Sequence, residues 1–222
     1  PGALTADYLL SKGVNKMDAT SAHSITIPGA IDAWVRLHEK YGSMDFADIL
    51  KPAIDCAENG YVVTDRTSVD WQMGVAKLQK NEAASEIFLK NGKPPAAGTT
   101  WRMPKLAATL KVIAKNGRAA FYEGDIAEQM TETLKAAGGL HEASDFAETG
   151  ADFVAPIHSE YHGHTVHQIP PNGQGITALI MLNILKRLDM NGLDPLGAKR
   201  LHLEAEAARL AYLARNKYVA DP

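Results

Sequence analysis

The chain has 222 residues, of which 45% are hydrophobic, so it can bury a core as one large domain or two small ones. Its net charge of −3 excludes the basic surface that nucleic acid or an anionic membrane needs, and no apolar run approaches the length of a transmembrane span. We therefore expect small molecules or other proteins as partners.

The first strong pattern is a strand that runs into a helix. β-favouring residues over 24–27 predict the strand, and helical spacing predicts the helix over 30–41. On this helix the spacing groups apolar residues such as Trp34 on one side and directs Asp32 away from them. Gly42 is expected to end the helix.

Further helices and a long loop follow in the first two thirds of the chain. The single cysteine, Cys56, excludes an internal disulfide and is expected to be buried and inert, because it lies in an apolar-periodic run. Residues 91–100 hold two prolines and two glycines and predict a surface loop, a possible joint between subdomains. We expect helices over 4–11, a kinked pair at 44–50 and 52–58, and further helices over 65–78, 103–115 and 124–138.

The last third predicts a β-hairpin followed by two long helices. Strands are expected over 153–160 and 164–169, with a tight turn at 162–163, and helices over 175–188 and 198–218. The charged residues of the last helix are spaced for ordinary solvated pairs three or four positions apart. They are Glu204, Glu206, Arg209 and Arg215.

A cluster of imidazole and carboxylate side chains in the hairpin has the composition of a zinc or iron site. It comprises His158, Glu160, His162, His164 and His167. Strand alternation puts the first four on one face only if the turn at Gly163 does not intervene, and it puts His167 on the other face. We therefore expect no metal here.

The loop between the hairpin and the next helix is the better candidate site. It reads Pro-Pro-Asn-Gly-Gln-Gly over 170–175, and its glycines permit close backbone approach or positive φ. Free amides at the helix start favour an anion or a polar ligand. Asn172, Gly173 and Gln174 are the predicted substrate-binding residues. The alternative is that the glycines only permit a sharp strand-to-helix corner.

Six blocks occur in an order that resembles the large subunit of the γ-glutamyltransferase family, whose members are N-terminal-nucleophile hydrolases. The most informative block, 21–63, resembles the signature of that subunit. The other blocks are residues 117–127, 138–146, 161–164, 170–185 and 204–222. The resemblance covers essentially the whole chain.

The resemblance implies a helix-rich α+β fold, the large-subunit part of a four-layer α/β/β/α sandwich. Residues 1–222 would form a single domain that is incomplete at both ends. The implied activity is hydrolysis or transfer of a γ-glutamyl or related acyl group, for example in glutathione, without a cofactor. The alternatives are an oxamate amidohydrolase, a cephalosporin acylase or a catalytically silent homologue.

The catalytic residue implied by the resemblance is a threonine that becomes N-terminal by autocatalytic cleavage. The family's cleavage segment, Thr-Thr or Thr-Ser followed by His, does not occur in this sequence. We therefore expect no catalytic residue within the chain and a nucleophile on a small subunit encoded downstream. The chain opens on Pro1-Gly2, so we expect its true start upstream, and cytoplasmic and periplasmic locations both stay open.

Overall fold

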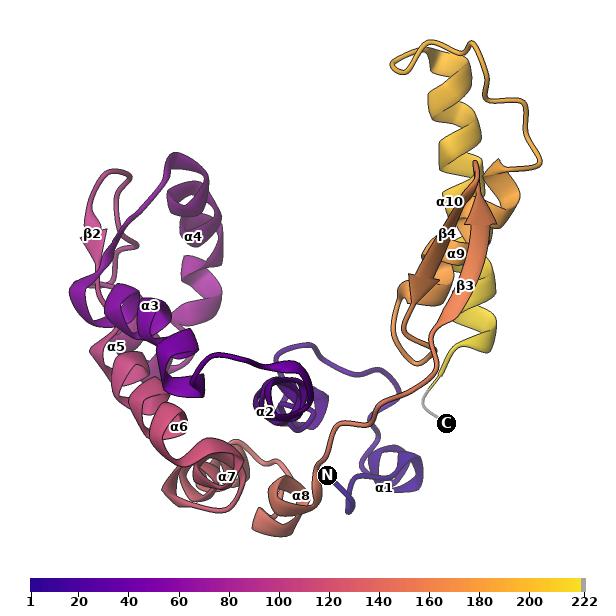
Figure 1. The fold of residues 1–222 in the computed structure, drawn as a ribbon. Coiled ribbons are helices and arrows are strands. Elements are labelled where there is room, and N and C mark those ends of the chain that lie inside the picture. The colour runs from indigo at the N-terminus through magenta and orange to yellow at the C-terminus, as the bar shows by residue number, and fades with distance from the viewer. Residues whose placement is uncertain (221–222) are drawn as a thin grey trace. The chain divides into compact units, whose positions relative to one another are not determined.

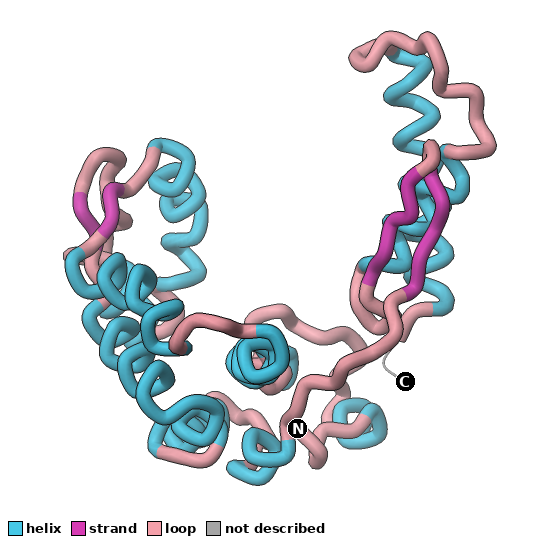
Figure 2. The backbone as a smooth tube through the Cα atoms, in the orientation of Figure 1, coloured by secondary structure: helices cyan, strands magenta, loops and turns pink. Residues whose placement is uncertain are grey.

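The computed structural model describes residues 1–220, whose contacts form two compact units that divide between Ala151 and Asp152 (Figure 1). Helices dominate both units, and the described strands form two sheets of two strands each (Figure 2). The expected helix-rich α+β class is confirmed. Residues 91–100, the predicted joint, lie inside the first unit, and the single-domain interpretation stays a prediction.

The first unit is built almost entirely from helices. Its only described sheet is the antiparallel pair β1–β2, in which Tyr61 lies opposite Trp101. In chain order the elements are α1 (Ala6–Ser11), the 3-10 helix η1 (Ala22–Ser24), α2 (Ala30–Tyr41), α3 (Phe46–Asn59), β1 (Tyr61–Val62), α4 (Asp65–Leu78), α5 (Glu82–Phe88), β2 (Thr100–Trp101), α6 (Pro104–Tyr122), α7 (Asp125–Ala136) and α8 (Ala143–Glu148).

Local sequence signals set several of these boundaries. Helix α2 has the predicted bounds, and Gly42 follows its last residue. Helix α4 begins after Thr64, whose hydroxyl accepts a hydrogen bond from the Thr67 amide, as an N-cap does. Two predictions are wrong. Helix α3 is one helix with Pro52 inside it, and 24–27 belongs to none of the described strands, because Ser24 ends η1 and residues 25–27 follow it without regular structure.

The core of the first unit lies where α3 and α6 pack together, with Ile54, Ile113 and Tyr122 among its buried residues. Helix α2 also contacts α6, and it buries Asp32 completely while Trp34 stays 44% exposed. The expectation that Asp32 points away from the packed side is therefore wrong. Its carboxylate tolerates burial because arginine side chains neutralise it, as described below.

The prediction that Cys56 is buried is also wrong, because the structure exposes this residue. The buried residues of α3 are Leu50, Ile54 and Ala57. At 3.6 residues per turn these three share one stripe, and Cys56 falls on the opposite side of the helix.

The second unit consists of a hairpin and two helices, of which α9 packs on the hairpin. It contains β3 (Ile157–Tyr161), β4 (His164–Gln168), α9 (Gly175–Leu185) and α10 (Ala198–Tyr218). Helix α9 packs on β3, where the Ser159 hydroxyl lies 2.8 Å from Asn183 Oδ1, and α10 packs on α9. The predicted hairpin and both helices are confirmed. Within residues 1–220, no helix has the length and apolarity needed to cross a bilayer.

The hairpin turn follows from two adjacent residues with positive φ. His162 has φ +46° and Gly163 has φ +79°, the signs that a two-residue turn between twisted strands requires. The end of the sixth sequence block, residues 221–222, lies outside the described residues.

Candidate functional site

The predicted substrate-binding loop joins the end of β4 to the start of α9. Asn172, Gly173 and Gln174 are all exposed in it. Gln174 is the N-cap residue of α9 but makes no side-chain cap, and its carbonyl accepts the Thr177 amide at 3.0 Å. The start of α9 therefore presents amide groups and the positive end of a helix dipole beside the loop, which suits a polar or anionic group. The binding role of these three residues stays a prediction.

The glycine that the fold requires in this loop is Gly175, which is not one of the three predicted substrate-binding residues. A Cβ atom at Gly175 would lie 2.8 Å from Gln168 Cβ and 3.0 Å from the Ile169 carbonyl oxygen. A Cβ at Gly173 would meet nothing within 4 Å, and Gly173 does not have positive φ. The loop thus needs glycine where it packs against the end of β4, and Gly173 leaves open space beside the exposed backbone.

The histidines of the hairpin are distributed over its two faces differently from the prediction. Strand register places His158 directly opposite His167, and their ring centroids are 5.5 Å apart. Directly opposite residues share a face of the sheet, so the expectation that His167 lies on the other face is wrong. The turn reverses the chain and resets the alternation, and His164 pairs with Tyr161 instead. Residues 1–220 hold no group of three or more side chains arranged for a metal.

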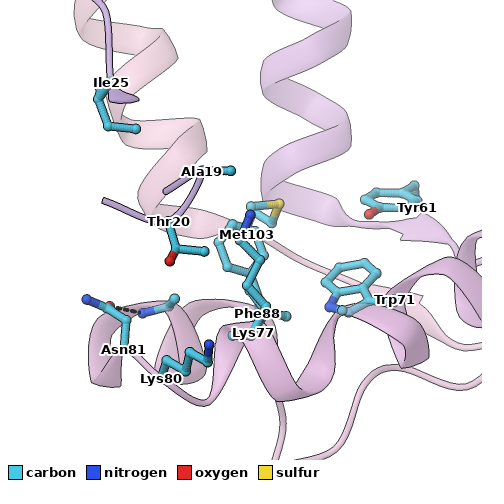
Figure 3. A pocket seen from close by; sticks show the side chains of 13 residues that line it. Ala19, Thr20, Ile25, Tyr61, Trp71, Lys77, Lys80, Asn81, Phe88 and Met103 are labelled. Carbon is cyan, nitrogen blue, oxygen red and sulfur yellow. Dashed lines mark hydrogen bonds between the residues drawn. The ribbon is translucent and has the colours of Figure 1, made fainter. Parts of the chain in front are cut away.

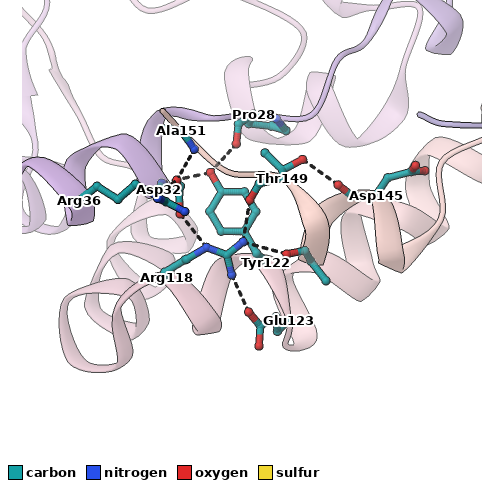
Figure 4. A network of polar contacts seen from close by, with 10 residues as sticks. Pro28, Asp32, Arg36, Arg118, Tyr122, Glu123, Asp145, Thr149 and Ala151 are labelled. Atoms are coloured by element: carbon teal, nitrogen blue, oxygen red, sulfur yellow. Dashed lines mark hydrogen bonds and ion pairs between the residues drawn. The ribbon is translucent and has the colours of Figure 1, made fainter. Parts of the chain in front are cut away.

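The most extensive polar network centres on Asp32, in the first turn of α2 (Figure 4). Its Oδ1 accepts the Arg118 Nε–H at 2.6 Å, and its Oδ2 accepts the Arg36 Nε–H and the Ala151 amide, each at 2.6 Å. The Asp32 amide donates to the Tyr122 hydroxyl at 3.2 Å. This one carboxylate therefore links α2 to α6 and to the chain that follows α8.

Arg118 reaches this position because of a glycine. Gly117 has φ 63° and ψ −146°, which breaks α6 just before the arginine. The Arg118 guanidinium then donates to Glu123 and to the carbonyls of Ala147 and Thr149 at 2.8 Å and 2.6 Å. The same group lies over the Tyr122 ring, 4.9 Å from its centroid. The family-like block at 117–127 therefore encodes a clamp on the end of α8.

The electrostatics of Asp32 indicate a structural role. Burial alone would raise its pKa, but the Ala151 amide, Arg118 and Arg36 together hold the pKa below its usual value. Both oxygens already accept charge-assisted or backbone hydrogen bonds, so little capacity remains for a substrate. No local pattern in the sequence indicates this network, because the partners of Asp32 lie 4, 86 and 119 residues away along the chain.

The charged residues of α10 form local pairs, as predicted. Glu206 pairs with Arg209 at 2.7 Å, and Glu204 pairs with Arg200 at 2.8 Å. Arg215 instead lies over the Tyr212 ring, 5.4 Å from its centroid. These contacts give the helix no acid–base set.

Comparison with solved structures finds the same fold in an acylase. The crystal structure of cephalosporin acylase from Bacillus halodurans matches with a TM-score of 0.89 and 32% identity, over 100% of this chain and 42% of that chain. The profile of the gamma-glutamyltranspeptidase family matches residues 1–222. The chain therefore belongs to the gamma-glutamyltranspeptidase family, which confirms the resemblance found in its sequence.

Two curated relatives have similar identity. The chain is 35% identical over 199 residues to the glutathione hydrolase-like YwrD proenzyme of Bacillus subtilis, covering 90% of this chain and 38% of that protein. It is 34% identical over 227 residues to the glutathione hydrolase proenzyme of Escherichia coli, covering 100% of this chain and 39% of that protein. The chain thus spans about two fifths of the length of the curated relatives that it matches.

Proposed function

We propose that this chain is the large-subunit portion of an enzyme that cleaves or transfers a γ-glutamyl group, with glutathione as the first substrate to test. The observation that carries the proposal is the family match over residues 1–222. It is supported by the relatives in Bacillus subtilis and Escherichia coli, which are glutathione hydrolase-like and glutathione hydrolase proenzymes.

In the proposed mechanism the nucleophile comes from a small subunit that completes the protein. Cleavage of a proenzyme would free a threonine whose α-amine serves as base and whose hydroxyl attacks the γ-glutamyl carbonyl. The amide nitrogen leaves as an amine, and an ester to the threonine is formed. Water or an acceptor amine then releases the acyl group, which gives hydrolysis or transfer respectively.

In this proposal the present chain positions the acyl group. The loop of Asn172, Gly173 and Gln174 would hold a polar substrate group through backbone amides at the start of α9. The exposed backbone at Gly173 allows an approach that a side chain would block. The Asp32 network keeps the first unit rigid and takes no chemical part.

A second candidate is an acylase or amidohydrolase that accepts a different acyl group, such as a cephalosporin acylase or an oxamate amidohydrolase. The similarity to cephalosporin acylase from Bacillus halodurans favours keeping this alternative. The catalytic step would be the same, and the two candidates differ only in the acyl group that the loop must accept.

The test uses the full-length protein with γ-glutamyl-p-nitroanilide, glutathione, oxamate and an acylated cephalosporin as competing substrates. We expect two polypeptides on a denaturing gel and preferred turnover of the γ-glutamyl compounds. Preferred turnover of oxamate or the cephalosporin would select the second candidate. The 222-residue chain expressed alone should release no p-nitroaniline. If the chain alone did turn over the substrate, and a substitution of Asn172 or Gln174 abolished that turnover, the proposal that the nucleophile comes from a small subunit would be refuted.

A further inference from the structure

A cavity of about 810 Å³ lies within the first unit, between the loop that precedes α2 and the helices α4 and α5. Figure 3 shows Ala19 and Thr20 of the loop near side chains such as Phe88 and Lys80. This volume is in the range of sites that hold small molecules. Nothing in the proposed γ-glutamyl chemistry uses this cavity.

Trp71 and Phe88 form an aromatic side of the cavity, and Trp71 also contacts Trp101. The Trp71 ring lies edge-on to Trp101 with centroids 5.2 Å apart, and its centroid is 6.3 Å from that of Phe88. Trp71 and Phe88 are each half-buried, and both line the cavity. Such rings offer stacking or edge contacts to a planar apolar group without first having to be ordered.

The charge of the lining has one sign. Lys77 and Lys80 are its charged side chains, and no carboxylate lines the cavity. Among the described residues, neither ammonium group has an ion-pair partner within 4 Å. The carboxylate of Asp18 lies near enough to interact with both lysines, but it already accepts the amide and hydroxyl of Thr20, each at 2.8 Å. The lining thus favours an anionic group.

Helix α4 contributes a glycine to the lining of the cavity. Gly74 lines it, although glycine inside a helix is less stable than alanine. A Cβ atom at this position would meet nothing within 4 Å, so no described contact requires glycine. The absence of a side chain leaves open space beside this part of the lining.

We propose that this cavity binds a small amphipathic anion of the aryl carboxylate class. The ring would pack against Trp71 and Phe88, and the carboxylate would pair with Lys77 and Lys80. Gly74 would leave space for the ring beside α4.

The first test is isothermal titration of the full-length protein with 2-naphthoate, and with the neutral 2-naphthylmethanol as matched ligand. We expect one saturable site for 2-naphthoate with a Kd of roughly 10–100 µM, as for a small ligand of moderate efficiency. The neutral compound should bind at least about tenfold more weakly. Absence of saturable binding would overturn the proposal.

Variants then place the binding in the cavity. Gly74→Leu should abolish binding while leaving Tm unchanged or higher, because its side chain enters open space and favours the helix. The double change Lys77→Gln and Lys80→Gln should weaken 2-naphthoate at least about tenfold and leave the neutral compound unaffected. The control is Lys51→Gln with Lys115→Gln, which removes the same charge from two exposed positions outside the cavity and should stay within twofold. Wild-type affinity in either Gly74→Leu or the Lys77/Lys80 variant would refute the assignment.

Discussion

Replacing Arg118 by methionine removes the guanidinium group that hydrogen-bonds to four other residues of the first unit. The substitution keeps an unbranched side chain over the Tyr122 ring. The change deletes hydrogen bonds to the fully buried Asp32 carboxylate, to Glu123 and to the carbonyls of Ala147 and Thr149. Breaking one side of a buried ion pair costs about 3–5 kcal/mol of stability. Because a second arginine and a backbone amide remain on the carboxylate, we expect the lower end, about 3 kcal/mol.

The matched variants use the same substitution at less buried pairs. Arg36 binds the other oxygen of Asp32, but its side chain is 43% exposed, so Arg36→Met should cost about 1 kcal/mol. Arg66 pairs with Asp70 at the surface with 85% of its side chain exposed, so Arg66→Met should change stability by less than about 0.5 kcal/mol.

Urea unfolding, followed by tryptophan fluorescence, reports the stability of the first unit, in which all three arginines lie. The three tryptophans, Trp34, Trp71 and Trp101, all belong to the first unit. A loss of about 3 kcal/mol corresponds to a fall in Tm of about 6–12 °C for a protein of this size. If Arg118→Met lay within 1 kcal/mol of the wild type, or if it equalled Arg36→Met, the clamp would not be the main support of Asp32.

Three further predictions concern acid stability, the loop and the histidines. Because the pKa of Asp32 is lowered in the folded state, its contribution to stability is present above the unfolded pKa of about 4 and is lost as pH falls through the folded pKa. In urea titrations below pH 5, the stability of Asp32→Asn should therefore fall less steeply with pH than that of the wild type. Equal slopes for the two proteins would contradict this assignment. Gly175→Ala should lower stability by about 1–3 kcal/mol because its Cβ meets the end of β4, whereas Gly173→Ala should leave stability unchanged. In the full-length enzyme, Gly173→Val should lower activity more than roughly tenfold, because its side chain blocks close approach of the substrate. Unchanged catalysis in Gly173→Val would mean that the loop is a structural corner only. The double change of His158 and His167 to alanine should leave activity and metal content unchanged. Elemental analysis should find far less than one zinc or iron per chain. A stoichiometric metal in the wild type that is lost in this variant would reverse the expectation.

Local patterns in the sequence were sufficient for most helices and for the hairpin. The bounds of α2 followed from apolar spacing with Gly42 after it, and the N-terminus of α4 followed from the cap at Thr64. The hairpin followed from residues that accept positive φ at 162–163. Such features depend on neighbours within a few residues, so a single sequence contains them. The ordered blocks also identified the family without any coordinates.

Which side of a helix is buried depended on the tertiary structure. The pattern of α2 grouped Trp34 with the apolar side and directed Asp32 away, yet α6 packs where Asp32 lies, because Arg118 neutralises it from 86 residues away. In the same way, Gly175 is required by contact with the end of β4, and the room beside Gly74 exists only where the early loop meets α4 and α5. Burial, charge pairing and open space are set by residues distant in sequence, and hydrophobic periodicity carries no information about those partners.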